Sequence, residues 1–285
     1  MRRIDLHCHT TASDGTLSPA ALVRLAKEIG LAAVAITDHD TIDGLAEGLA
    51  EGERIEEEVI SGVELSTDLI DRSVHILGYF IDPTDAGLAG KLAWAREARA
   101  NRNVKIADRF RELGIPLNLE EVTQIAGGEV VGRPHFAKWL VDHGHVRDFQ
   151  EAFNVYLGSK GKAYLPKVRL TPEEAIILIK GAGGLVVLAH PGTYERDEAW
   201  ITKALDILTE LGLDGLEVYY SQHSPRQTAY FESMARSRGL LLTGGSDFHG
   251  STSFEVSLGT GKDNNLAAPY ELLSAMKLKL DSGNK

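Results

Sequence analysis

The chain has 285 residues, of which 43% are hydrophobic and 25% are charged, and its formal net charge is −11. This is enough apolar sequence for a large core, while the acidic charge disfavours binding to duplex DNA, which needs many Lys and Arg contacts to phosphate. A single cysteine, Cys8, excludes an intrachain disulfide and a multi-cysteine zinc site. Because no apolar run reaches about 18 residues, we expect a cytoplasmic protein without a membrane segment.

The first segment, MRRIDLHCHTTASDG, opens with a strand-like run that holds two histidines. Side chains alternate along an extended segment, so His7 and His9 are expected on one side and Cys8 on the other. One such pair is also compatible with two ordinary hydrogen-bonded polar residues at a strand end. The remaining histidines of the chain must therefore decide whether this is a metal site.

Strand-like and helical segments alternate along most of the chain. A helix is predicted in SPAALVRLAKEIG, where Ser18 caps and Pro19 takes the first helical position, and a further strand and helix follow in LAAVAITDHD and TIDGLAEGLAEGER. Later strands are predicted in GGLVVLAHP, LDGLEVYY and GLLLTGGSDFH. This alternation predicts an α/β fold with a mainly parallel sheet and outer helices, and we favour a barrel over an open sheet.

The alternation stops between residues 87 and 170, where several consecutive amphipathic segments predict helices. It resumes at Thr171, which forms a capping-box pattern with Glu174. We therefore expect a discontinuous barrel domain over residues 1–86 and 171–285. A helical insertion over residues 87–170 is expected to form part of the substrate pocket.

Seven of the ten histidines occur at the ends of strand-like runs, together with selected carboxylates. In a parallel α/β barrel the carboxyl ends of the strands meet on one face, so residues far apart in sequence converge there. Nitrogen and oxygen donors in this number suit two or three divalent metal ions that share a bridging carboxylate. The predicted metal ligands are His7, His9, Asp14, His39, Glu64, His75, His190, Asp247 and His249.

The ordered motifs HxH, TDH, VE, H, AHP and DxH resemble those of the polymerase and histidinol phosphatase (PHP) family of metal-dependent phosphoesterases, which are related to amidohydrolases. The resemblance implies a distorted seven-stranded β/α barrel of the TIM type and a hydrolase acting on phosphoester bonds. It also implies metal binding by the nine residues named above. Many members have His where this chain has Asp14, and this harder oxygen ligand favours manganese, with zinc or iron as alternatives.

The helical insertion and the GRPHFA segment at residues 132–137 resemble the branch that removes phosphate from 3′,5′-nucleoside bisphosphates, some members of which trim RNA from its 5′ end. We expect a small phosphorylated nucleotide as substrate, with short RNA as an alternative. A cation beside a helix start suits anion binding, although a surface ion pair would also account for Arg133. The predicted substrate-binding residues are Arg133, His135, Lys162 and His223.

The expected reaction is attack on phosphorus by a metal-bridging hydroxide, since metals lower the pKa of bound water and neutralise phosphoryl charge. The predicted catalytic residues are Asp247, His249 and His223, and either histidine could supply the proton for the leaving group. The alternatives are a histidinol phosphate phosphatase, a 5′–3′ exoribonuclease and a hydrolytic deaminase or amidase. A non-enzymatic PHP module is disfavoured, because the ligand set is intact.

Overall fold

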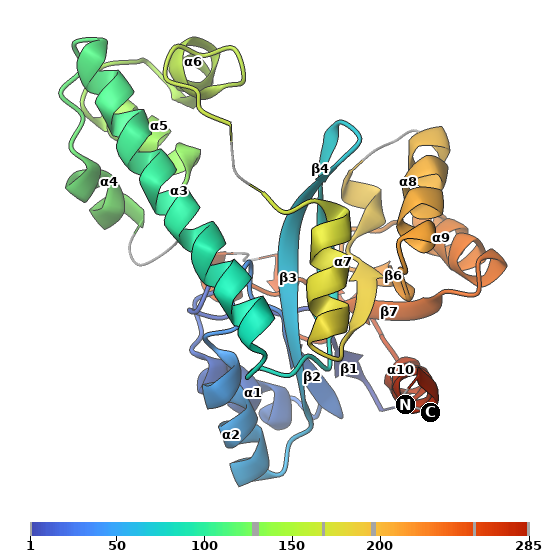
Figure 1. Cartoon of the computed structure of the whole chain (residues 1–285). Helices are drawn as coiled ribbons and strands as arrows, with labels where there is room; N and C mark the ends of the chain where they lie inside the picture. Colours follow the sequence, from blue (N-terminus) through green and yellow to red (C-terminus); the bar gives the residue numbers. More distant parts are fainter. Residues whose placement is uncertain (1, 127–130, 167–168, 195–197, 253–254, 284–285) are drawn as a thin grey trace. The chain divides into compact units, whose positions relative to one another are not determined.

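A computed structural model describes residues 2–126, 131–166, 169–194, 198–252 and 255–283 (Figure 1). The chain divides into two compact units, which we describe separately. The barrel unit comprises residues 1–91 and 169–285, and the helical unit comprises residues 92–168.

Seven strands of the barrel unit form one sheet in sequence order. Neighbouring strands are parallel except at β4, which is antiparallel to both β3 and β5. The first and last strands approach each other, because the Leu6 N–H donates to the Gly244 carbonyl at 3.2 Å and Cys8 bridges to Phe248. The strands are β1 (Ile4–Asp5), β2 (Ala33–Ile36), β3 (Val59–Leu69), β4 (Arg72–Tyr79), β5 (Leu185–Leu188), β6 (Gly215–Tyr220) and β7 (Leu241–Gly245).

This nearly closed sheet confirms the predicted α/β barrel, and the reversal of β4 is the distortion that separates it from a fully parallel barrel. Helices lie around the outside of the sheet (Figure 1). The expected caps are present: Ser18 accepts from the Ala21 N–H at 3.2 Å, and Thr171 and Glu174 form a reciprocal capping box. The helices are α1 (Pro19–Glu28), α2 (Leu45–Ile55), α7 (Pro172–Gly181), α8 (Glu198–Glu210), α9 (Pro225–Ser237) and α10 (Tyr270–Gly283).

Apolar side chains fill much of the barrel unit's core, and Ile60, Leu77, Tyr79 and Val187 belong to one buried cluster. Leu77 pairs directly with Glu64 across β3 and β4, so these two side chains share a face of the sheet. Glu64 is fully buried. The same face of the sheet therefore carries both the apolar core residues and the buried carboxylate of Glu64.

The helical unit has its own hydrophobic core, which includes Phe110, Phe136, Trp139 and Leu157. Helix α3 begins in the barrel unit, to which its residues 86–91 belong, and continues in the helical unit. Within the described residues, no helix of the protein has the length and apolar character needed to cross a membrane. The helices are α3 (Ala86–Glu112), α4 (Leu119–Ala126), α5 (Arg133–Asp142), α6 (Phe149–Ala152) and a π-helical turn (Phe153–Leu157).

Candidate metal centre

The nine residues predicted as metal ligands lie in one continuous cluster of the barrel unit, linked by side-chain contacts of 2.8–3.8 Å. Most of them follow the carboxyl ends of parallel strands. From the sequence we expected His7 and His9 to lie within the first strand. Strand β1 instead ends at Asp5, and both histidines follow it. Their rings nevertheless lie 5.2 Å apart between centroids.

His75 reaches the cluster by a different route. It lies inside β4, where it pairs with Ser66 of β3, so the prediction that it ends a strand was wrong. Because β4 runs against its neighbours, its first half lies beside their carboxyl ends. The reversed strand therefore brings His75 to the same end of the barrel as the other ligands.

Glu64 is the centre of the cluster, and five imidazoles surround its fully buried carboxylate. Its Oε2 atom faces three rings and its Oε1 atom faces two. The Oε2 distances are 3.3 Å to His7 Nε2, 3.3 Å to His9 Nε2 and 2.9 Å to His39 Nδ1, and the Oε1 distances are 2.8 Å to His75 Nδ1 and 3.0 Å to His190 Nε2.

Two further carboxylates complete the cluster. Asp247 Oδ1 lies 3.2 Å from His9 Nε2 and 3.4 Å from His7 Nε2. Asp14 Oδ1 lies 3.3 Å from His249 Nε2, and the rings of His9 and His249 stack with centroids 4.0 Å apart. Three anionic groups are thus distributed among six imidazoles.

The donor set fits divalent metal ions. Among the described residues, five buried cluster atoms make no hydrogen bond: His7 Nε2, both ring nitrogens of His9, His39 Nδ1 and Glu64 Oε2. These atoms meet one another only in ion-pair contacts, such as His39 Nδ1 with Glu64 Oε2 at 2.9 Å, and a metal ion bound among them would satisfy them together. The cluster contains three groups of residues, and within each group the donor atoms lie within 4.8 Å of one another. The groups are His9, Asp14, His39 and His249; His7, His9, Glu64 and Asp247; and His39, Glu64 and His75.

His190 belongs to none of these three groups of described residues, although its Nε2 atom lies 3.0 Å from Glu64 Oε1. Its Nδ1 atom is 2.9 Å from Thr193 Oγ1. The role of His190 as a ligand stays a prediction.

Opposite charges dominate the protonation of the cluster. Burial alone would raise the pKa of Glu64, but the imidazoles of His39, His75 and His7 hold it well below its ordinary value. Burial alone would lower the pKa of His39, but Glu64, Asp14 and Asp247 raise it to about 9. His39 therefore carries an extra proton near neutral pH in the metal-free site, and a metal ion bound there must displace it.

Several supporting residues escaped the sequence analysis. Asp38 accepts hydrogen bonds from the Thr10 N–H at 2.7 Å and from the Ser13 hydroxyl at 2.6 Å, which holds the loop that carries Asp14. Glu217 is buried within β6 and contacts His7. A charged residue within the apolar run LDGLEVYY is a signal that could have identified Glu217.

His223 is buried, and both of its ring nitrogens are hydrogen-bonded to the backbone. The Nδ1–H donates to the Val218 carbonyl at 2.9 Å, and Nε2 accepts from the Gly192 N–H at 3.1 Å. Burial lowers the pKa of this imidazole. Proton donation by His223 would thus require one of these hydrogen bonds to break, and its contact with substrate stays a prediction.

The other predicted substrate-binding residues lie in the helical unit. The Arg133 guanidinium donates to the Leu157 carbonyl at 3.1 Å and lies near the rings of Phe153 and Tyr164. His135 Nδ1 accepts from the Gly132 N–H at 3.0 Å at the start of α5. Lys162 is exposed. Their roles toward a substrate stay predictions.

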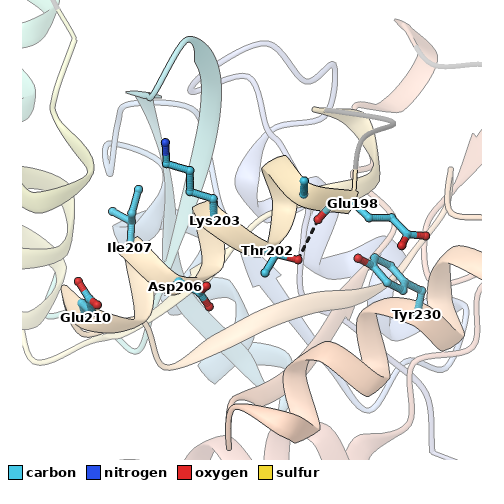
Figure 2. A pocket seen from close by; sticks show the side chains of 8 residues that line it. Glu198, Thr202, Lys203, Asp206, Ile207, Glu210 and Tyr230 are labelled. Atoms are coloured by element: carbon cyan, nitrogen blue, oxygen red, sulfur yellow. Dashed lines mark hydrogen bonds between the residues drawn. The ribbon is translucent and has the colours of Figure 1, made fainter.

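A surface hollow of about 440 Å³ follows one side of α8 and includes Tyr230 of α9 (Figure 2). Glu198, Lys203, Asp206 and Glu210 contribute charged side chains to it. None of the nine clustered residues lines this hollow. It is therefore separate from the candidate metal centre.

Comparison with known proteins gives consistent matches. Residues 5–127 match the PHP domain family. The chain is 39% identical to the 5′-3′ exoribonuclease Rnm of Escherichia coli strain K12, over 86% of this chain and 84% of that protein. It is 35% identical to the 3′,5′-nucleoside bisphosphate phosphatase of Chromobacterium violaceum, over 87% and 88% of the two chains.

A solved structure is also similar along nearly the whole chain. It belongs to a protein from Bifidobacterium adolescentis that is assigned as a metal-dependent phosphoesterase. The two structures have a TM-score of 0.74 and 32% sequence identity, and the match covers 98% of this chain and 96% of the other.

Proposed function

This chain belongs to the PHP family of metal-dependent phosphoesterases, hydrolases of phosphoester bonds, and we propose that its substrate is a 3′,5′-nucleoside bisphosphate whose 3′-phosphate is removed. The relative from Chromobacterium violaceum is named a 3′,5′-nucleoside bisphosphate phosphatase and matches along most of both chains. The nucleotide and the position of the cleaved phosphate are the parts that we propose.

The observation that supports metal-dependent hydrolysis is the buried cluster around Glu64, and the likeness to the Chromobacterium violaceum relative supports the bisphosphate as substrate. Divalent ions held by these residues would lower the pKa of bound water and neutralise charge on the phosphoryl oxygens. Imidazole and carboxylate donors suit manganese, zinc and iron, and the oxygen ligand Asp14 favours manganese. This chemistry needs no nucleophilic side chain from the protein.

The protein's own groups orient the donors. The Nδ1–H of His249 donates to the Asp247 carbonyl at 2.9 Å, which directs Nε2 toward Asp14. Of the two predicted proton donors, His249 faces the cluster, whereas both ring nitrogens of His223 contact the backbone. We therefore propose that His249 binds metal through Nε2, a role that leaves its ring no free proton for the leaving group.

A second candidate function is 5′–3′ exoribonuclease activity. The relative from Escherichia coli bears that name at 39% identity over a comparable share of the chain. Both reactions are metal-assisted hydrolyses of a phosphoester, and they differ in the group that leaves phosphorus. The same metal cluster would therefore serve either substrate.

The test is release of phosphate or nucleotide from a panel of substrates by the full-length protein loaded with Mn²⁺. The panel contains a nucleoside 3′,5′-bisphosphate, the matching 3′- and 5′-monophosphates, histidinol phosphate and a 5′-phosphorylated oligoribonucleotide. We expect the highest kcat/KM with the bisphosphate and loss of activity after chelation.

Preference for the oligoribonucleotide would favour the second candidate, and preference for histidinol phosphate would contradict both. Full activity in a verified metal-free sample would contradict the metal-dependent mechanism.

A further inference from the structure

Strand β6 contains an irregularity beside the metal centre. Glu217 pairs with Thr243 of β7, but the next pair is Tyr219 with Gly244, so Val218 is an extra residue on β6. Such a bulge interrupts the alternation of side chains along a strand and re-aims those that follow. Regular alternation would place Glu217 and Tyr219 on one face and Tyr220 on the other.

Because of the bulge, the side chains of Glu217 and Tyr220 both point toward the metal centre. The Tyr220 hydroxyl donates to Asp247 Oδ2 at 3.0 Å. Tyr219 points elsewhere, since its hydroxyl lies 3.5 Å from Glu232 of α9. Glu217 and Tyr220, which are three positions apart, therefore contact the same cluster. Tyr219, which lies between them, points away from the cluster toward α9.

Glu217 joins two predicted ligands from different strands. Its carboxylate is fully buried; Oε1 lies 3.0 Å from His7 Nδ1, and Oε2 accepts from the His190 backbone N–H at 2.7 Å. A carboxylate can only accept, so the His7 Nδ1 carries a proton and Nε2 is directed toward Glu64 and Asp247. The contact thus selects which nitrogen of His7 is available to a metal.

The second contact of Glu217 supports an unusual backbone. His190 has φ = 25° and ψ = 60°, a strained region that non-glycine residues rarely occupy. The short charge-assisted hydrogen bond to Glu217 offsets part of that strain. This conformation directs His190 Nε2 to Glu64 Oε1, at 3.0 Å.

Tyr220 has an equivalent effect on Asp247. It occupies Oδ2 of this carboxylate, so that Oδ1 is the atom facing His7 and His9. Asp247 also lies in the left-handed region, at φ = 59°. A fixed hydroxyl donor therefore decides which oxygen of Asp247 is presented to the cluster.

We propose that the β6 bulge makes Glu217 and Tyr220 positioning residues of the metal centre, which orient His7, His190 and Asp247 for metal binding. The inference rests on the metal-dependent function proposed above, but not on the identity of the phosphoester. Loss of such outer partners of metal ligands typically weakens metal affinity by about 10–100-fold.

The test compares the variants Glu217→Gln and Tyr220→Phe with two matched controls. Tyr219→Phe removes the neighbouring hydroxyl that points to α9, and Glu57→Gln neutralises a buried carboxylate paired with Lys27 instead of with the cluster. Mn²⁺ affinity is measured by calorimetry on the full-length protein without substrate. The melting temperature is measured in chelator and in saturating Mn²⁺.

We expect both β6 variants to bind Mn²⁺ about 10–100-fold more weakly. We also expect them to gain less melting temperature from a fixed Mn²⁺ concentration, because stabilisation by a ligand depends on its affinity. The two controls should bind as the wild type does. The variant Glu217→Asp keeps the carboxylate but shortens the side chain. Because we infer that Glu217 acts by orienting its partners, we expect the Mn²⁺ affinity of this variant to lie between those of Glu217→Gln and the wild type.

Wild-type Mn²⁺ affinity in Tyr220→Phe and Glu217→Gln would overturn the inference, even if their melting temperatures in chelator fall, since that result indicates a purely structural role. If Glu217→Gln does not fold, Tyr220→Phe alone decides. Normal Mn²⁺ binding by a protein that cleaves none of the tested phosphoesters would contradict the proposed function and leave this inference intact.

Discussion

The Nε2 atom of His249 lies 3.3 Å from the Oδ1 atom of Asp14, although these residues come from opposite ends of the chain. Together with His9 and His39 they form one of the three donor groups of the cluster. Asp14 is the only carboxylate in that group, and its side chain is 39% exposed. A substitution of Asp14 therefore disturbs the buried core less than a substitution of the fully buried Glu64 would, which makes this group the best one to test by mutation.

We predict that Asp14→Ala lowers the metal content by about one ion per chain and leaves the ions held around Glu64 in place, because Glu64 and Asp247 retain their own imidazoles. Metal content after gel filtration measures this. The control is Asp281→Ala, which removes an exposed carboxylate from α10. Loss of all metal in Asp14→Ala would show that the three groups do not fill independently.

Asp247→Asn and His9→Ala are each predicted to abolish turnover while the fold is retained. His9 belongs to two of the three donor groups, and Asp247 Oδ1 faces both His7 and His9, so the effect on kcat should exceed the roughly 100-fold upper range for outer partners of metal ligands. Asn tolerates the positive φ of Asp247, so the backbone should not change. Kinetics and circular dichroism measure the two effects, and an unchanged kcat would remove the residue from the site.

Arg133→Ala is predicted to reduce the preference for a 3′,5′-bisphosphate over the matching 3′-monophosphate. A charge-assisted contact to the second phosphate is worth on the order of 1.5–3 kcal/mol, or roughly tenfold to a hundredfold in kcat/KM. The comparison of both substrates in wild type and variant isolates this effect from damage to the metal centre.

Lys138→Ala is the control for Arg133→Ala, because it removes a positive charge from the same helix, α5, where Lys138 pairs with Asp142. It should leave the preference unchanged. Equal preference for the bisphosphate in wild type and Arg133→Ala would contradict the role predicted for Arg133.

Metal affinity is predicted to rise with pH between about 6.5 and 9. Burial favours the neutral form of His39, but Glu64, Asp14 and Asp247 raise its pKa to about 9, so the metal-free protein holds a proton there at pH 7. This raised pKa stabilises the metal-free protein fully below the ordinary pKa of 6.5, and the contribution is lost as pH rises through about 9.

Binding of a metal must displace that proton. Calorimetry of Mn²⁺ binding in buffers with different ionisation enthalpies should therefore show proton release at pH 7. Affinity independent of pH, with no proton released, would contradict the predicted protonation of His39.

The barrel and the convergence of most candidate ligands could be predicted from the sequence, because strand ends and helix caps leave local patterns. His39, His190 and His249 each follow an apolar run, and Ser18 and Thr171 mark helix starts at the positions the structure shows. The convergence of such residues requires only that the carboxyl ends of parallel strands meet at one end of a barrel.

The tertiary structure decided the features that have no local signal. The reversal of β4 depends on its pairing with β3 and β5, and this reversal carries His75 into the cluster from inside a strand. The bulge at Val218 depends on the register between β6 and β7, and it directs both Glu217 and Tyr220 to the ligands. Strand direction and register are set by long-range pairing, so a local pattern of residue types does not specify them.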